Sequence, residues 1–134
     1  MNVKINYITD GDIAGALTVI GENPKNDIYY STGGGPEGVI VAAALSCYGG
    51  QIQGRLVLDK DEAIRAKKLG ITELDKKYNI NDMVKGDVIF CASGVTSGDL
   101  AEGIKNYNNK YEVTTFVLHK DSRINKKIKN IYYK

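Results

Sequence analysis

The stretch D-I-Y-Y-S-T-G-G-G-P-E-G-V-I-V-A-A-A-L-S-C-Y, residues 27–48, decides the fold that we expect for this chain. Residues 27–32 have the side chains of a strand, and three consecutive glycines follow them. Pro36 then stands where a helix should begin, because its φ suits the first turn and its missing N–H is not needed there. Residues 37–48 are apolar on nearly every side, which predicts a central helix that is covered on most sides.

The strand–turn–helix pattern also occurs upstream of this stretch. Residues 3–8 predict a strand that ends at the acidic turn Asp10-Gly11-Asp12, and the apolar spacing of residues 13–20 predicts a helix after it. Downstream we expect strands at 51–58, 88–92, 113–119 and 128–133, and helices at 61–68 and 100–104. The last two strands should form an antiparallel pair. The alternation predicts one α/β domain over residues 1–134, a layered sandwich with a mixed, mostly parallel sheet.

The composition indicates a globular domain. Hydrophobic residues make up 43% and charged residues 25% of the 134 residues, which argues against a disordered, collagen-like or disulfide-scaffold chain. The net charge of +2 is too small to indicate nucleic acid by itself. The longest apolar run, residues 39–47, is too short for a membrane span, and no charged-then-apolar leader is evident. Cys47 and Cys91 lie in apolar stretches, which favours two buried thiols in a reduced cytoplasm.

The glycine turn at residues 31–38 is the strongest candidate for chemistry. Glycines let a ligand approach the backbone, and the helix that follows directs free N–H groups and a partial positive charge at the same place. This geometry suits a phosphate. Glu37, in the first helical turn, could hold a divalent cation against that phosphate. The residue types leave open a simpler interpretation, in which this is a helix start and Glu37 serves only the helix dipole.

Two more turns combine glycine with acidic residues. The turn Asp10-Gly11-Asp12 could accept hydrogen bonds from sugar hydroxyls or bind a cation through water; alternatively, one of its aspartates caps the helix. The turn at residues 94–99 repeats the pattern, and Ser97 or Thr96 as helix N-cap explains most of it. Because ligands of open α/β sheets bind outside the carboxyl ends of the strands, we expect the three turns to gather at one edge of the sheet.

Two other features have simpler explanations. His119 has no acidic or cysteine neighbour at metal-ligand spacing, so we expect a core or surface role for it. The tail, residues 120–134, holds six lysine and arginine residues against the single acid Asp121, with Tyr132 and Tyr133 among them. This pattern could bind nucleic acid by charge and stacking, but a solvated edge strand protected by lysines explains it better.

Taken in order, the motifs resemble one family over nearly the whole chain. The matching segments are DGDIA (residues 10–14), GGGPEGV (33–39), GRL (54–56), AKKLGI (66–71), GVTSGDL (94–100) and EGI (102–104). They resemble the C-terminal portion of the class II (GlpX-type) fructose-1,6-bisphosphatases, close relatives of which also hydrolyse sedoheptulose 1,7-bisphosphate. The resemblance implies a cytoplasmic, Mg²⁺- or Mn²⁺-dependent sugar phosphatase of gluconeogenesis and glycerol metabolism, with a layered α/β fold related to inositol monophosphatases.

The resemblance also implies roles for individual residues. In that family the acid of the glycine turn, here Glu37, is a metal ligand, and a glycine of the same turn, here Gly34, contacts substrate. The turn Asp10-Gly11-Asp12 also binds the sugar phosphate. No nucleophile with an adjacent general base is evident in this chain, so no catalytic residue is assigned.

The family's remaining site residues lie upstream of the Asp10-Gly11-Asp12 turn. They are the other metal-binding carboxylates, a threonine near the attacked phosphate and a Lys-Pro-Arg phosphate clamp, whereas this chain has nine residues there. The resemblance therefore implies a C-terminal domain without its N-terminal catalytic part. Its expected partners are that missing half and a sugar bisphosphate, with a homo-oligomer left open. The alternative is a non-catalytic sugar-phosphate-binding module, and whether this chain alone is an enzyme stays open.

Overall fold

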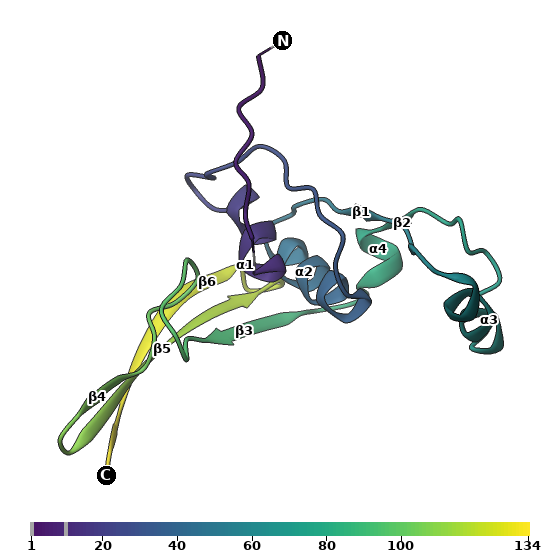
Figure 1. The fold of residues 1–134 in the computed structure, drawn as a ribbon. Helices are drawn as coiled ribbons and strands as arrows, with labels where there is room; N and C mark the ends of the chain where they lie inside the picture. Colours follow the sequence, from purple (N-terminus) through teal and green to yellow (C-terminus); the bar gives the residue numbers. More distant parts are fainter. Residues whose placement is uncertain (1, 10) are drawn as a thin grey trace.

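The computed structural model describes residues 2–9 and 11–134 as a mixed α/β chain (Figure 1). Its helices are α1 (Asp12–Ala16), the 3-10 helix η1 (Leu17–Val19), α2 (Gly35–Cys47), α3 (Lys60–Lys68) and α4 (Ile80–Met83). Its strands are β1 (Gln53–Gly54), β2 (Tyr78–Asn79), β3 (Ile89–Ser93), β4 (Lys105–Tyr107), β5 (Lys110–His119) and β6 (Ile124–Tyr133).

Strand β5 is the centre of the main sheet. It pairs along its whole length with β6, and the registers place β3 beside residues 115–119 of β5 and β4 beside residues 110–112. The predicted antiparallel pair at the end of the chain is confirmed as β5 and β6.

The prediction of a mostly parallel sheet is not confirmed. Every ladder in the described part of the chain is antiparallel, including the small β1–β2 pair. The expected parallel ladders needed the strands predicted at 3–8 and 27–32, and neither segment has a ladder partner among the described residues. The β5–β6 pair is antiparallel because its connection, the four residues 120–123, is too short for the crossover that a parallel pair needs.

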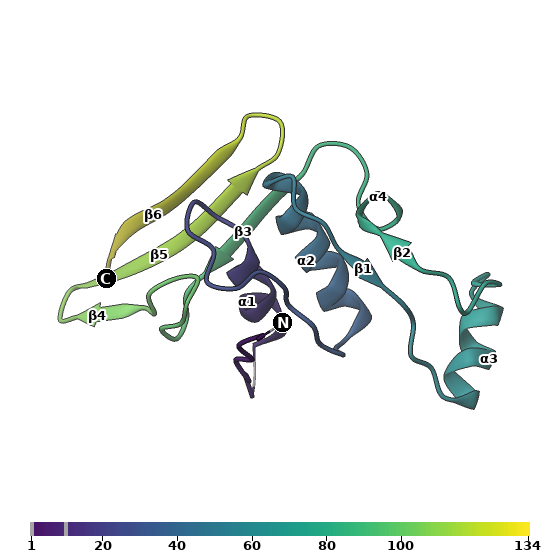
Figure 2. The same ribbon diagram turned by 90° about the horizontal axis from the view of Figure 1, so that it is seen from above.

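The core lies between α2 and one face of this sheet, with α1 beside α2 (Figure 2). Phe90 of β3 and Phe116 of β5 meet edge to face, with ring centroids 6.3 Å apart. The buried members of the core are Ala16, Leu17, Val41, Ala44, Leu45, Phe90 and Leu118. The core therefore joins residues 16–17 and the strands β3 and β5 to helix α2.

Helix α2 begins as predicted, with Pro36 in its first turn. One face of its second half, from Val41 to Leu45, is buried against the sheet. Near its start, however, Val39 and Ile40 are 47% and 42% exposed. The prediction of a covered central helix is therefore confirmed for the second half of α2 and wrong for its first turns.

Helix α3 stands at the end of an arm that projects away from the sheet (Figures 1 and 2). It confirms the helix predicted at 61–68, and it is stabilised locally. The Asp59 carboxylate accepts a hydrogen bond from the Glu62 N–H at 2.8 Å, and the Glu62 carboxylate accepts one from the Asp59 N–H at 2.9 Å. Such a capping box satisfies two backbone donors that the helix itself leaves unpaired.

Three predicted strands differ in the structure. Residues 3–8 and 27–32 run as open chain without a ladder partner among the described residues, and only Gln53 and Gly54 of the strand predicted at 51–58 are paired. Their sequences have strand character, but a ladder also needs a neighbouring strand, which the described residues do not provide.

The helix predicted at 100–104 is wrong. These residues form a tight loop, in which the Gly98 N–H donates to the Ala101 carbonyl at 3.1 Å and the Ile104 N–H donates to the Val95 carbonyl at 3.1 Å. A Cβ on Gly94 would collide with the Glu102 backbone. Three apolar residues in five were too few to separate a helix from a loop that buries Ala101.

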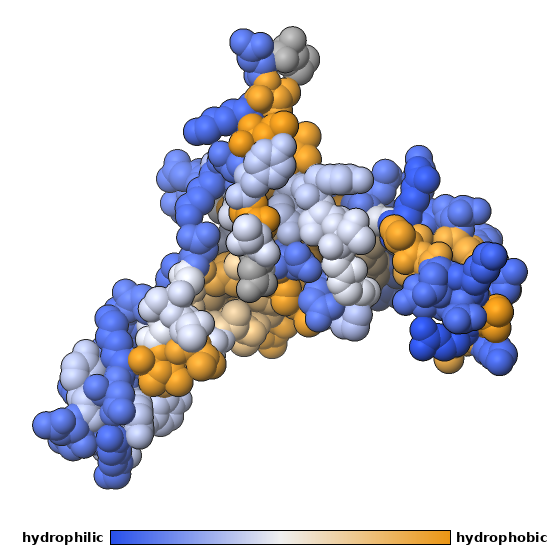
Figure 3. All heavy atoms as spheres, viewed as in Figure 1, coloured by the Kyte–Doolittle hydropathy of each residue, from blue (hydrophilic) through white to orange (hydrophobic). Residues whose placement is uncertain are grey.

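Many large apolar side chains of this chain are exposed. They lie on the N-terminal segment (Figure 3), at Ile28 and Tyr30, on the outer face of the sheet, and on the arm at Val57, Ile64 and Leu69. Cys91 is exposed on that outer face, so the prediction of two buried thiols is wrong for it, whereas Cys47 is half-buried. In the described part of the chain, no helix combines the length and the apolar character that crossing a membrane requires.

Candidate functional site

Asp12 and Glu37 lie against neighbouring glycines of the turn that precedes α2. A Cβ placed on Gly33 would stand 3.1 Å from the carboxyl carbon of Asp12, and a Cβ placed on Gly34 would stand 3.1 Å from that of Glu37. The two carboxylates thus occupy the space that side chains at positions 33 and 34 would fill. The structure therefore brings together two acids that lie 25 residues apart in the sequence.

The local conformation at the start of α1 explains the position of Asp12. Gly11 precedes the helix with φ 88° and ψ 53°, a left-handed conformation that glycine adopts readily. Asp12 is therefore the first helical residue and not the N-cap, and its carboxylate accepts a hydrogen bond from the Ser31 hydroxyl at 3.4 Å. The capping interpretation is thus wrong for Asp12. Asp10 lies outside the described residues.

The first backbone N–H groups of α2 lie at the same turn. Its N-cap is Gly34, so no side chain caps the first N–H groups. Unpaired N–H groups and the positive end of the helix dipole make such a terminus attractive to anions. The half-buried Glu37 belongs to the first turn and folds back over Gly34. This position suits both a metal ligand and a carboxylate that serves only the helix dipole.

The third acidic turn does not join the other two. Asp99 forms an ion pair with Lys25 at 3.0 Å, and both line a shallow cavity of about 130 Å³ along α1 and η1. The Ser97 hydroxyl accepts a hydrogen bond from the Gly103 N–H at 3.0 Å, and no helix follows it, so the N-cap predicted for this turn is wrong. The end of this turn therefore lies along α1 and η1, where Asp99 and Leu100 line the cavity together with Ala14 and Leu17.

The described residues at this site offer too few side-chain ligands to hold a metal ion by themselves. Within residues 2–9 and 11–134, no three His, Cys, Asp or Glu side chains are grouped so that they could hold one. Divalent cations such as Mg²⁺ take about six oxygen ligands, some of them water. Asp12 and Glu37 could therefore provide only part of a ligand set.

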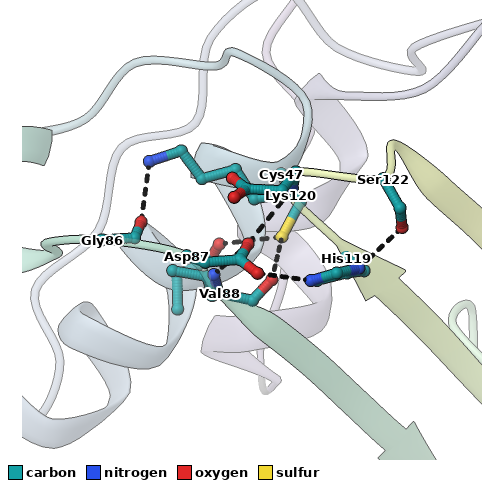
Figure 4. A network of polar contacts seen from close by, with 9 residues as sticks. Cys47, Gly86, Asp87, Val88, His119, Lys120 and Ser122 are labelled. Carbon is teal, nitrogen blue, oxygen red and sulfur yellow. Dashed lines mark hydrogen bonds and ion pairs between the residues drawn. The ribbon is translucent and has the colours of Figure 1, made fainter.

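His119 has two polar partners in the structure, although the sequence shows no acidic or cysteine neighbour at metal-ligand spacing (Figure 4). Its Nε2 lies 2.6 Å from Oδ2 of Asp87, and its Nδ1 lies 2.6 Å from the hydroxyl of Ser122. The Asp87 carboxylate also accepts hydrogen bonds from the backbone N–H groups of Val88 at 2.8 Å and Asp121 at 3.2 Å. We refer to His119, Asp87 and Ser122 as the histidine clamp, since they join the β5–β6 turn to the loop before β3.

Electrostatics and position indicate a structural role for the histidine clamp. The hydrogen bond from His119, and then those from the two backbone N–H groups, hold the pKa of Asp87 below its usual value of 3.8. Cys47, near the C-terminal end of α2, lies 3.7 Å from the Val88 carbonyl, so the clamp lies at the opposite end of α2 from the glycine turn. A 13-residue helix spans about 20 Å, which separates the two places.

Sequence reasoning missed the clamp because Asp87 and His119 lie 32 residues apart. A signal was available only through the register, in which Ile89 pairs with His119 and so brings the residues just before β3 beside it.

The lysine-rich tail forms an edge strand, β6, as predicted. Lys129 and Lys105 both approach the Glu102 carboxylate, at 3.1 Å and 2.9 Å, and both stand 3.7 Å from Glu112. Part of the positive charge of this region is therefore balanced within the chain.

Comparison with known proteins shows which family the chain resembles over nearly its whole length. The family model described as "Bacterial fructose-1,6-bisphosphatase, glpX-encoded" matches residues 1–132. Among similar curated proteins are fructose-1,6-bisphosphatase 1 class 2 of Escherichia coli (strain K12) and the fructose-1,6-bisphosphatases class 2 of Escherichia coli O6:H1 and Shigella flexneri, each 34% identical to the chain over 148 residues. The match covers 99% of this chain but 44% of each relative, so the chain spans less than half of their length.

Proposed function

The chain belongs to the bacterial, glpX-encoded fructose-1,6-bisphosphatase family, and on this premise we propose that it forms the C-terminal part of a metal-dependent fructose-1,6-bisphosphatase. The proposed reaction is hydrolysis of the 1-phosphate of fructose 1,6-bisphosphate, in the cytoplasm, as a step of gluconeogenesis and glycerol metabolism. The observation that carries the proposal is the placement of Asp12 and Glu37 against neighbouring glycines at the uncapped start of α2.

In this proposal the glycine turn binds the sugar phosphate. The N–H groups at the start of α2 attract the phosphate oxygens, and Gly34, which has no side chain, is the proposed substrate contact in this turn. Asp10, Gly11 and Asp12 orient the sugar, with the aspartates accepting hydrogen bonds from its hydroxyls. Because Gly11 holds a left-handed conformation, replacing it would move Asp12 relative to the turn.

Glu37 is the proposed metal ligand of this chain, for Mg²⁺ or Mn²⁺. When bound, a divalent cation neutralises charge on the phosphoryl group and lowers the pKa of a coordinated water. Because the described residues do not complete a ligand set, the remaining ligands would come from a polypeptide that corresponds to the uncovered part of the relatives. We therefore propose that this chain alone releases no phosphate.

A second candidate function is a module that binds sugar phosphates without hydrolysing them. The incomplete ligand set of the described residues favours it. The two candidates differ in one outcome. Joined to the missing part, a phosphatase domain gives turnover, whereas a binding module gives only binding.

The test uses a chimera in which the part of the E. coli K12 relative that lies outside the match is fused in front of this chain. We expect the chimera to release phosphate from fructose 1,6-bisphosphate in the presence of Mn²⁺ or Mg²⁺, and the chain alone to release none. Sedoheptulose 1,7-bisphosphate is assayed in parallel.

The matched variants of this chimera are Glu37→Gln and, as control, Glu73→Gln on an exposed turn. Removing a metal ligand should lower turnover at least about 100-fold, because loss of residues that merely orient a ligand already costs 10–100-fold. The melting temperature should change little in either variant. Equal losses of turnover and stability in Glu37→Gln would reject the metal role, and a folded chimera that binds substrate without turnover would favour the binding module.

A further inference from the structure

Two segments of the described chain have the side-chain pattern of strands without a strand beside them. Residues 2–8 and 28–32 run as open chain in Figure 1 and take part in none of the ladders formed by the described residues. In the first segment, Val3, Ile5 and Tyr7 are 73%, 66% and 88% exposed. This is the alternation of a strand that presents one apolar face.

The second segment shows the same alternation. Ile28 and Tyr30 are 82% and 95% exposed, whereas Tyr29 between them lies over α1, where a Cβ on Gly15 would stand 2.9 Å from its ring. One face of this segment is therefore seated on the protein, and the other points away from it.

The two segments lie next to each other. The side-chain amide of Asn6 donates to the side-chain carbonyl of Asn26 at 3.0 Å, and Ile8 and Tyr29 both pack over the same glycine of α1, Gly15. No backbone hydrogen bond joins the described residues of the two segments. They thus combine unpaired backbone groups with outward apolar side chains, which is the combination that an added strand recognises.

We propose that residues 2–8 and 28–32 are docking strands for the polypeptide that corresponds to the uncovered, N-terminal part of the relatives. More than half of the length of those relatives lies outside the match, while almost all of this chain lies inside it. Both segments also lead directly into the turns that carry Asp12 and Glu37, where the ligand set is incomplete. A strand added at this place would bring its own polypeptide to the site. The inference rests on the proposed function, because the occupant is the rest of the same enzyme.

The apolar surface gives the docking a driving force. Apolar patches of this kind are uncommon on free-standing proteins and mark interaction sites, and Figure 3 shows the apolar side chains along the projecting N-terminal segment. Burying Val3, Ile5 and Ile28 would add hydrophobic free energy to the main-chain hydrogen bonds of the new ladder.

Hydrogen–deuterium exchange tests the docking without relying on turnover. It is measured on this chain alone and on the chimera with the upstream part of the E. coli K12 relative. We expect the amides of residues 3–8 and 28–32 to exchange at least about tenfold more slowly in the chimera, because an added ladder protects them. Amides of residues 55–57, which lie in another unpaired segment, should be unchanged.

Proline variants supply the second measurement. Ile5→Pro and Tyr30→Pro remove a ladder donor and are tolerated only where a strand is unpaired, so they should leave the melting temperature of the chain alone unchanged and lower that of the chimera. The matched control is Val57→Pro, since Val57 is 76% exposed in an unpaired segment. Equal effects of all three variants on the chimera would overturn the proposal.

The remaining outcomes separate docking from function. Protection of both segments without phosphate release would support the docking and count against the phosphatase. Phosphate release without protection would overturn the docking and leave the function standing. If the chimera does not fold, the upstream fragment is added in trans to the chain, and absence of protection there overturns the docking. Concentration-dependent protection in the chain alone would also overturn it, because the occupant would then be a second copy.

Discussion

At the scale of single residues, the carboxylate of another residue lies against each of two neighbouring glycines. Position 33 leaves room for Asp12 and position 34 for Glu37, so the absence of two side chains allows two acids to share one turn. Local sequence predicted the two turns as separate candidates, and their proximity was expected from the carboxyl edge of a parallel sheet. The two acids lie close together although the described residues form no parallel ladder. Asp87 beside His119 escaped prediction because its proximity depends on strand register and not on neighbouring residues.

Gly34→Ala tests the fit of Glu37 over the turn. The new Cβ would displace the Glu37 carboxylate, which is the end of a flexible side chain, so we expect little change in stability. Turnover of the chimera should fall at least about tenfold, as expected when the surroundings of a ligand are disturbed. Gly98→Ala is the matched control, because a Cβ there also meets nothing within 4 Å and Gly98 lies outside the glycine turn. Similar turnover in the two variants would show that the position of Glu37 is unimportant.

At the scale of elements, prediction succeeded where an element carries its own signals. The start of α2 has its proline, α3 has a capping box, and β5 and β6 are joined by a short turn. It failed where the element depends on a distant partner. Residues 3–8 have strand character but no ladder in the described chain, and residues 100–104 form a loop that buries Ala101 and leaves Ile104 exposed.

Because of the histidine clamp, the stability of the folded chain should depend on pH in the acid range. Because the pKa of Asp87 is lower in the folded chain than its usual 3.8, its contribution to stability is present above that value and is lost as the pH falls through the folded pKa. We expect Asp87→Asn to lower the melting temperature by roughly 2–4 °C near neutral pH, and the difference from the parent chain to shrink towards pH 2–3.

The check is a series of melting curves from about pH 7 to about pH 2.5, across the acid limb of the titration. Asp75→Asn, on an exposed turn, is the matched control and should follow the parent chain throughout. A constant difference between Asp87→Asn and the parent over the whole series would show that the carboxylate acts by something other than its charge.

At the scale of the whole molecule, family membership was predicted correctly, because the motifs occur in the family's order over nearly the whole chain. The sheet arrangement was not, because the mostly parallel sheet needs the strands predicted at 3–8 and 27–32, which form no ladder in the described part of the chain. In the described residues the core lies beneath α2, and an arm carries α3 away from it. Its stability should therefore be unevenly distributed, with the sheet more resistant to opening than the arm.

Leu118→Ala tests this division. Leu118 is 1% exposed in the core between α2 and β5, so truncating it should cost about 2–5 kcal/mol. Amides of β5 and α2 that exchange through opening of the core should then exchange roughly 30-fold faster or more, while those of α3 keep the rates of the parent chain. Leu69→Ala is the matched control, because Leu69 is 81% exposed at the end of α3 and lies outside the core. If the α3 amides of the parent exchange as slowly as those of β5, and accelerate equally in Leu118→Ala, the arm and the sheet unfold as one cooperative unit.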